Sequence, residues 1–106
     1  MGTNQNKSAA RAFLERLNKG PITFGQLVES HRICDEISQA ELARSMGISR
    51  QQMSDIEKGR RLVSVERAAK FARILGYPVS AFVAAALEDQ LRNAGLKMRV
   101  KVDAAY

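Results

Sequence analysis

A cluster of polar side chains between residues 50 and 58 carries the functional groups that could recognise the edges of nucleic-acid bases. Arginine pairs in bidentate fashion with guanine, glutamine pairs with adenine, and aspartate can accept a hydrogen bond from the amino group of cytosine. A helix that only needs to be solvated more often carries Glu and Lys in i, i+4 pairs. The chain instead places two adjacent glutamines beside an arginine, within the set Arg50, Gln51, Gln52, Ser54, Asp55 and Lys58. This set predicts a helix whose N-terminal end enters a major groove.

Two short helices joined by a tight turn are expected to position this cluster. Ser38 and Glu41 have the spacing of a capping box at the start of the first helix, and Ser49 and Gln52 have the same spacing at the start of the second. Gly47 is expected to end the first helix, because glycine takes a left-handed conformation without penalty. The connection of about three to four residues is typical of a helix-turn-helix. A plain helical hairpin in a small all-α bundle is the alternative.

The segment 38–59, SQAELARSMGISRQQMSDIEKG, resembles the motif of the Cro/C1-type helix-turn-helix family, also called the XRE family, which is typified by phage repressors and Cro. The resemblance extends over roughly residues 24–83, and residues 65–76 are similar to the helix that follows the motif in that family. It implies an all-α, five-helix, lambda-repressor-like DNA-binding domain at 22–83, with the motif at 39–58. It also implies double-stranded DNA as a partner.

The resemblance assigns a role to each outward residue of the motif. Gln39 matches a position that typically contacts a DNA phosphate, whereas Glu57 matches one that makes an internal hydrogen bond or ion pair. Some positions face bases or border that surface, and others lie in the loop after the second helix, where backbone contacts are common. The base-facing positions match Arg50, Gln51 and Asp55; the bordering ones match Gln52 and Ser54; the loop positions match Lys58, Arg60 and Arg61. Ser49, the N-cap of the second helix, is also expected at the DNA-binding surface.

Asp55 departs from the family pattern, which often has a neutral or basic residue at this position. An acid near phosphates is costly unless it reads a cytosine or pairs with a neighbour. Pairing within the helix, with Gln51 or Lys58, is the alternative to base reading.

Further helices and two flanking segments are predicted around the motif. Caps and apolar periodicity favour helices from Thr23 to about Ile33, from Ser64 to Leu75, and from Val79 or Ser80 to about Ala94. Residues 1–21 are expected to form an N-terminal arm, in which 8–18 could be an extra helix that braces a partner or frays. Disorder of the arm and contact of the arm with DNA are the alternatives.

The C-terminal region, 84–106, combines the end of the last helix with a change of period. Four apolar residues alternate with charged ones, which indicates a half-buried β-strand. A lone strand needs a partner, and a second copy of the protein is the simplest one. A disordered basic tail is the alternative. The residues expected at this dimer interface are Leu96, Met98, Val100 and Val102.

Composition agrees with nucleic-acid binding and gives no indication of catalysis. The net charge of +6 would supply the nonspecific part of DNA affinity. His31 is the only histidine, and a lone histidine is usually a surface or helix-end residue. Cys34 is the only cysteine and is expected in the core. No zinc-site spacing or glycine-rich phosphate loop occurs. We therefore expect no enzyme activity, no cofactor and no metal.

The 106 residues suit one domain without a membrane span, since no apolar run reaches about 18 residues. The start of the chain is polar, which does not suit a secretory signal. A cytoplasmic, nucleoid-associated protein of a bacterium or phage is expected. Two functions remain open: a homodimeric repressor that reads a pseudo-palindromic operator, and an antitoxin that neutralises a toxin protein and represses its own operon.

Overall fold

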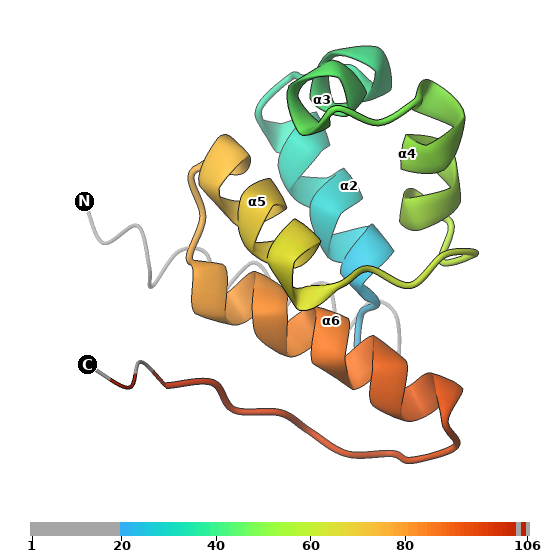
Figure 1. Ribbon diagram of the computed structural model, residues 1–106, viewed down its shortest axis with the longest axis vertical. Helices are drawn as coiled ribbons and strands as arrows, with labels where there is room; N and C mark the ends of the chain where they lie inside the picture. The colour runs from blue at the N-terminus through green and yellow to red at the C-terminus, as the bar shows by residue number, and fades with distance from the viewer. Residues whose placement is uncertain (1–19, 104, 106) are drawn as a thin grey trace.

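The computed structural model describes residues 20–103 and 105, and these residues contain five helices. The helices are α2 (Phe24–Cys34), α3 (Gln39–Met46), α4 (Arg50–Glu57), α5 (Val65–Leu75) and α6 (Val79–Asn93). α6 forms one side of the domain, and α2 and α5 pack on it; α3 lies at the far end of α2, and α4 packs alongside α2 and against α3 (Figure 1). The five-helix, all-α prediction is confirmed for this part of the chain. The predicted extra helix at 8–18 lies outside the described residues.

Three phenylalanines from different helices form the centre of the core. Phe24 of α2 makes edge-on contacts with Phe71 of α5 and Phe82 of α6, with ring centroids 5.7 and 5.9 Å apart. All three rings are almost fully buried. Aliphatic side chains from α3 and α4, including Leu42 and Met53, complete the same cluster. The core therefore joins the two short helices to the rest of the domain.

Local signals at the helix ends agree with the sequence. The capping boxes that begin at Thr23, Ser38 and Ser49 each show both of their hydrogen bonds. Gly47 adopts a left-handed backbone with φ of 74° and ends α3, as expected. α6 differs, because it begins after Pro78 without a side-chain cap. Its start is held by tertiary packing instead.

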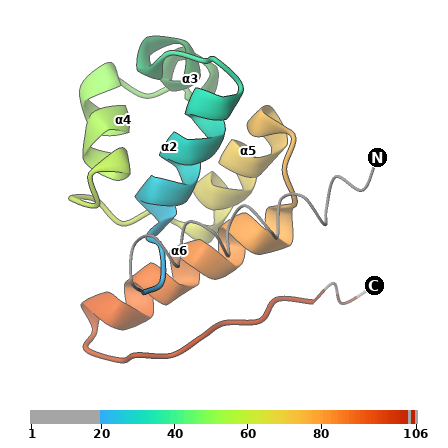
Figure 2. The ribbon, with the colours of Figure 1, turned by 180° about the vertical axis from the view of Figure 1, so that it is seen from behind.

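The predicted C-terminal β-strand is wrong: residues 96–103 have no regular secondary structure. The segment runs in an extended conformation alongside α6, on the side away from α3, as the two opposite views agree (Figures 1 and 2). The Leu96 amide donates to the Leu91 carbonyl (2.8 Å), and the Val100 amide donates to the buried Glu88 carboxylate (3.0 Å). A helix surface offers isolated acceptors rather than a ladder, so an alternating sequence lies here without forming a strand.

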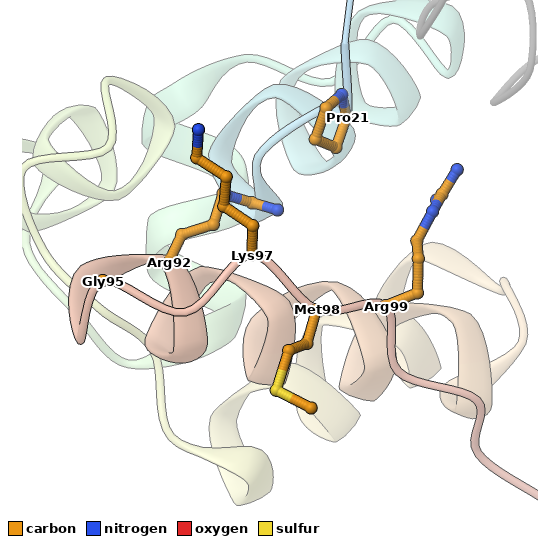
Figure 3. Close-up of a pocket in the computed structure, with 6 residues that line it drawn as sticks. All are labelled: Pro21, Arg92, Gly95, Lys97, Met98 and Arg99. Carbon is orange, nitrogen blue, oxygen red and sulfur yellow. The ribbon is translucent and has the colours of Figure 1, made fainter.

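The four apolar residues of this segment do not share one environment. Val102 packs against the core and Val100 is half-buried, both within their own chain. Leu96 and Met98 are 49% and 57% exposed. Beside them is a cavity of about 550 Å³, lined by Pro21, Arg92, Gly95, Lys97, Met98 and Arg99 (Figure 3).

The prediction that Cys34 lies in the core is also wrong. Cys34 is exposed, because it is the last residue of α2 and faces away from the core. His31 lies in the last turn of α2, as expected of a helix-end residue, but it is buried, and its ring lies against that of Tyr77 with centroids 3.7 Å apart and an interplanar angle of 35°. Within the described part of the chain, no helix is long and apolar enough to cross a membrane.

Candidate nucleic-acid interface

The turn between α3 and α4 presents the N-terminal end of α4 at the surface. The Ser49 hydroxyl accepts from the Gln52 amide (3.0 Å), and the Gln52 side-chain oxygen accepts from the Ser49 amide (2.9 Å). These two bonds satisfy backbone donors that the first turn of a helix cannot pair internally. Gln52, predicted as a residue bordering the base-reading surface, thus has its side-chain oxygen engaged in the cap.

The inward side of α4 is fixed by burial and by a close backbone approach. Met53 and Ile56 are 0% and 1% exposed, as the predicted apolar stripe requires. Gly25 of α2 lies so close to the end of α4 that an added Cβ would be 2.2 Å from the Ile56 carbonyl oxygen and 2.6 Å from that of Glu57. Only glycine allows the two helices to approach to this distance.

A buried polar network joins three helices at the same point. The Glu57 carboxylate, whose side chain is 2% exposed, accepts from Arg32 Nε (2.7 Å) and Nη2 (3.1 Å). It also accepts from Gln39 Nε2 (2.9 Å), and Arg32 Nη1 donates to the Ile37 carbonyl (2.8 Å). The hydrogen bond with Glu57 raises the pKa of Arg32 further above its ordinary value, so the guanidinium stays charged. The internal role predicted for Glu57 is confirmed.

Gln39, predicted as a phosphate contact, lies at the first position of α3 with its amide tied to Glu57. It is half-buried. The side-chain oxygen and the second N–H do not take part in this bond. Gln39 therefore links α3 to α4 and still has polar atoms at the edge of the outward surface.

The outward side of α4 and the loop after it carry the remaining predicted contacts. Some of these residues are exposed and the others are half-buried. The exposed ones are Ser49, Arg50, Gln51, Lys58, Arg60 and Arg61; the half-buried ones are Gln52, Ser54 and Asp55. All of them come from one helix and the loop that follows it, so the fold brings the predicted site together.

Asp55 is paired within the protein. Gln51 Nε2 donates to Asp55 Oδ1 (3.1 Å), and Arg60 Nη1 lies 3.8 Å from the same oxygen. The intrahelical alternative is thus observed with Gln51, and the second neighbour is Arg60 rather than Lys58. Between residues 50 and 73, seven Lys or Arg accompany three acids, and one of those acids, Glu57, is buried and paired. The segment from α4 through α5 therefore carries an excess of positive charge.

Three supporting residues were not identified from the sequence. Gly25 and Arg32 come from α2, before the motif, and Lys70 comes from α5, where its ammonium donates to the Met46 carbonyl at the end of α3 (3.1 Å). Gly25 sits in a helical segment without turn signals, and only tertiary packing explains it. For Arg32, the sequence indicated only that Glu57 needs an internal partner, and it did not identify which residue that partner is.

Comparison with known proteins agrees with this geometry. Residues 36–82 match the family model described as helix-turn-helix. The segment is a Cro/C1-type helix-turn-helix domain. Among solved structures, the chain is similar to the clp gene regulator ClgR from Corynebacterium glutamicum, at 29% sequence identity and a TM-score of 0.54, covering 68% of this chain and 78% of that one. No curated protein matches the sequence.

The helix-turn-helix domain makes this protein a DNA-binding transcription regulator. The match begins just before α3 and ends within α6, so α2 lies outside it although it holds α4 in place. Among the described residues, no group of three His, Cys, Asp or Glu side chains could hold a metal ion.

Proposed function

We propose that this protein is a homodimeric repressor that reads a pseudo-palindromic operator with the N-terminal end of α4. The observation that supports this most strongly is the division of α4 into two sides. Met53, Ile56 and Glu57 are held inside by the core and by Arg32, while Arg50 and Gln51 are exposed. A rigid helix with exposed Arg and Gln at its start suits insertion into a major groove.

Selection of bound DNA from a random pool tests the base-reading assignment. The wild-type protein is expected to select two inverted half-sites about one DNA turn, roughly 34 Å, apart. Arg50→Ala should weaken binding to the selected sequence by about 5- to 150-fold per half-site, since a bidentate contact contributes about 1–3 kcal/mol. Arg73→Ala is the matched control, because it removes the same charge from the last turn of α5. Equal effects of the two variants would refute the assignment.

The loop after α4 is proposed to contact phosphates through its three exposed cations. Neutralising them should weaken binding to all sequences and make the dependence of log K on log salt less steep by about 0.9 for each lost contact. An unchanged slope would show that the loop does not touch DNA. The residues to replace by glutamine are Lys58, Arg60 and Arg61.

The homodimer is proposed because one recognition helix reads only a short sequence, while two matched half-sites multiply discrimination. Of the apolar residues in the C-terminal segment, Leu96 and Met98 are exposed and available to a second copy. Leu96→Lys with Met98→Lys should shift the protein toward monomer in light scattering. A dimer of unchanged stability would place the interface elsewhere.

A reporter gene behind the selected operator should be repressed, and activation would contradict the repressor role.

An antitoxin is the second candidate, and the C-terminal segment is the observation that favours it. The cavity beside Met98 is bordered by Arg92, Lys97 and Arg99, and Figure 3 shows Met98 projecting away from the Pro21 side. This exposed apolar side chain, which projects to the opposite side from Lys97 and Arg99 in the segment alongside α6, could bind a partner protein while α4 binds DNA. Co-expression with the product of an adjacent reading frame tests this, with relief of growth inhibition as the expected result. Undiminished toxicity would reject the antitoxin function.

A further inference from the structure

The two adjacent glutamines at the start of α4 differ in what their amide groups are free to do. The Gln52 oxygen is engaged with the Ser49 amide, so its acceptor serves the cap. Gln51 is exposed and uses one N–H, which it donates to Asp55 Oδ1 at 3.1 Å. The sequence matched Gln51 to a base-facing position and Gln52 to a bordering one, and the structure leaves the oxygen and one N–H of Gln51 outside both of these bonds.

The hydrogen bond to Asp55 fixes which way the Gln51 amide faces. A side-chain amide has one oxygen that accepts and one NH₂ group with two donors, whereas an ionised carboxylate only accepts. The NH₂ group must therefore face Asp55, and the flipped orientation would set two oxygens against each other. One N–H and the oxygen of Gln51 remain available. This donor and acceptor pair is what the N7 and N6 atoms of adenine require.

Arg60, in the loop after α4, partly compensates the negative charge of Asp55. Arg60 Nη1 lies 3.8 Å from Asp55 Oδ1, and the Arg60 amide donates to the Asp55 carbonyl (2.9 Å). The side chain of Asp55 is 24% exposed and that of Arg60 is 65% exposed, so the pair itself contributes little to folding. Its position matters more, because a cation beside the carboxylate reduces the repulsion between Asp55 and DNA phosphates.

We propose that Asp55 is a positioning residue that holds Gln51 in the orientation that selects adenine, and that it does not read cytosine itself. This inference depends on the proposed major-groove function of α4. Its consequence is a specific base preference: one adenine in each half-site depends jointly on Gln51 and Asp55.

Base preference in selected DNA separates this role from a structural one. We expect the wild type to require adenine at one position of each half-site, and Gln51→Ala to lose that requirement. Asp55→Ala should weaken the adenine preference at the same position by about two- to fivefold, which corresponds to one ordinary hydrogen bond. Preferences at the other positions should stay as they are. At the adenine position, the Gln51→Ala/Asp55→Ala double variant should have the same base preference as Gln51→Ala alone, since the two residues act through one contact.

Asp55→Asn provides a variant of nearly the same shape. The asparagine amide can donate as well as accept, so it allows both orientations of Gln51. Adenine preference should fall in this variant although the helix is unchanged. Loss of a cytosine preference at a different position, with the adenine position intact, would show that Asp55 reads a base and would overturn the proposal.

A measurement without DNA keeps this inference separate from the proposed function. The side-chain NH₂ resonances of Gln51 should shift in the NMR spectrum of Asp55→Ala, while those of Gln52 should not. A wild type without sequence preference would overturn the proposed function and the adenine role together. Unmoved Gln51 resonances would overturn only the positioning role of Asp55.

Discussion

Replacement of Gly25 by alanine tests how closely α2 must approach α4. An alanine Cβ at this position would be 2.2 Å from the Ile56 carbonyl oxygen and 2.6 Å from that of Glu57. Ordinary contact begins at 3.4 Å, so the helices would have to separate by 1.2 Å to accept the methyl group. Both opposing atoms belong to the backbone and cannot rotate away as a side chain could.

Two effects of opposite sign decide the magnitude. Alanine has a higher helix propensity than glycine, which alone would stabilise α2 by about 0.8–1 kcal/mol. Forcing an extra group into a packed contact costs typically about 1–3 kcal/mol and occasionally more. The overlap here is severe, and the separation of α2 from α4 would also lengthen the bonds that Arg32 makes with Glu57. We expect a net loss of about 2 kcal/mol, because the clash outweighs the propensity.

Urea unfolding followed by circular dichroism measures this loss, and thermal unfolding should show a decrease in Tm of roughly 8–16 °C for a domain of this size. Gly20→Ala is the matched control, since a Cβ at Gly20 meets nothing within 4 Å. That variant should unfold at the same urea concentration as the wild type or at a slightly higher one. A Gly25→Ala protein as stable as the control would refute the close approach of the two helices. Operator affinity should fall with the stability, because α4 would be displaced.

Three further predictions concern contacts that hold the fold together. Arg32→Met should lower the free energy of unfolding in urea by about 3 kcal/mol, because it leaves the Glu57 carboxylate buried without its cation. Adding Glu57→Gln should restore part of this free energy. A double variant no more stable than Arg32→Met would show that the unpaired carboxylate is not the cause. Burial raises the pKa of Asp89 above its ordinary value of 3.8. Ionisation of Asp89 therefore lowers the free energy of unfolding as the pH rises from about 4 through the raised pKa. Asp89→Asn should remove this decrease, and a variant whose free energy of unfolding depends on pH as in the wild type would contradict the assignment to Asp89. Val100→Pro removes the amide that bonds to Glu88, and trypsin should then cleave faster after Lys97, a site that the proline does not block; an unchanged cleavage rate at Lys97 would show that this bond does not hold the segment.

The elements that the sequence predicted well depend on neighbouring residues. The capping boxes at Thr23, Ser38 and Ser49 are complete within four residues, and the left-handed turn needs only Gly47. Their physics is local, so the helix starts and the helix-turn-helix followed directly from them. The outward residues of α4 were also predictable, because burial of Met53 and Ile56 leaves the opposite side exposed.

The elements that were missed depend on what lies across the fold. Alternation at 96–103 predicted a β-strand, but period alone does not reveal whether the neighbour is a strand or a helix, and here it is α6, with Glu88 as the acceptor. His31 carried no sign that Tyr77 would stack on it.

A chain of contacts connects α6 to the proposed recognition surface. The Asp89 carboxylate accepts from the Phe24 amide at the first turn of α2 (3.0 Å), where an anion also interacts favourably with the helix dipole. The next residue, Gly25, contacts the end of α4, and Arg32 at the other end of α2 bonds to Glu57. α2 is thus anchored by α6 at its start and holds α4 at both of these points. Because α2 precedes the matched segment 36–82, substitutions outside the motif should alter DNA binding through the placement of α4, without any contact to a base.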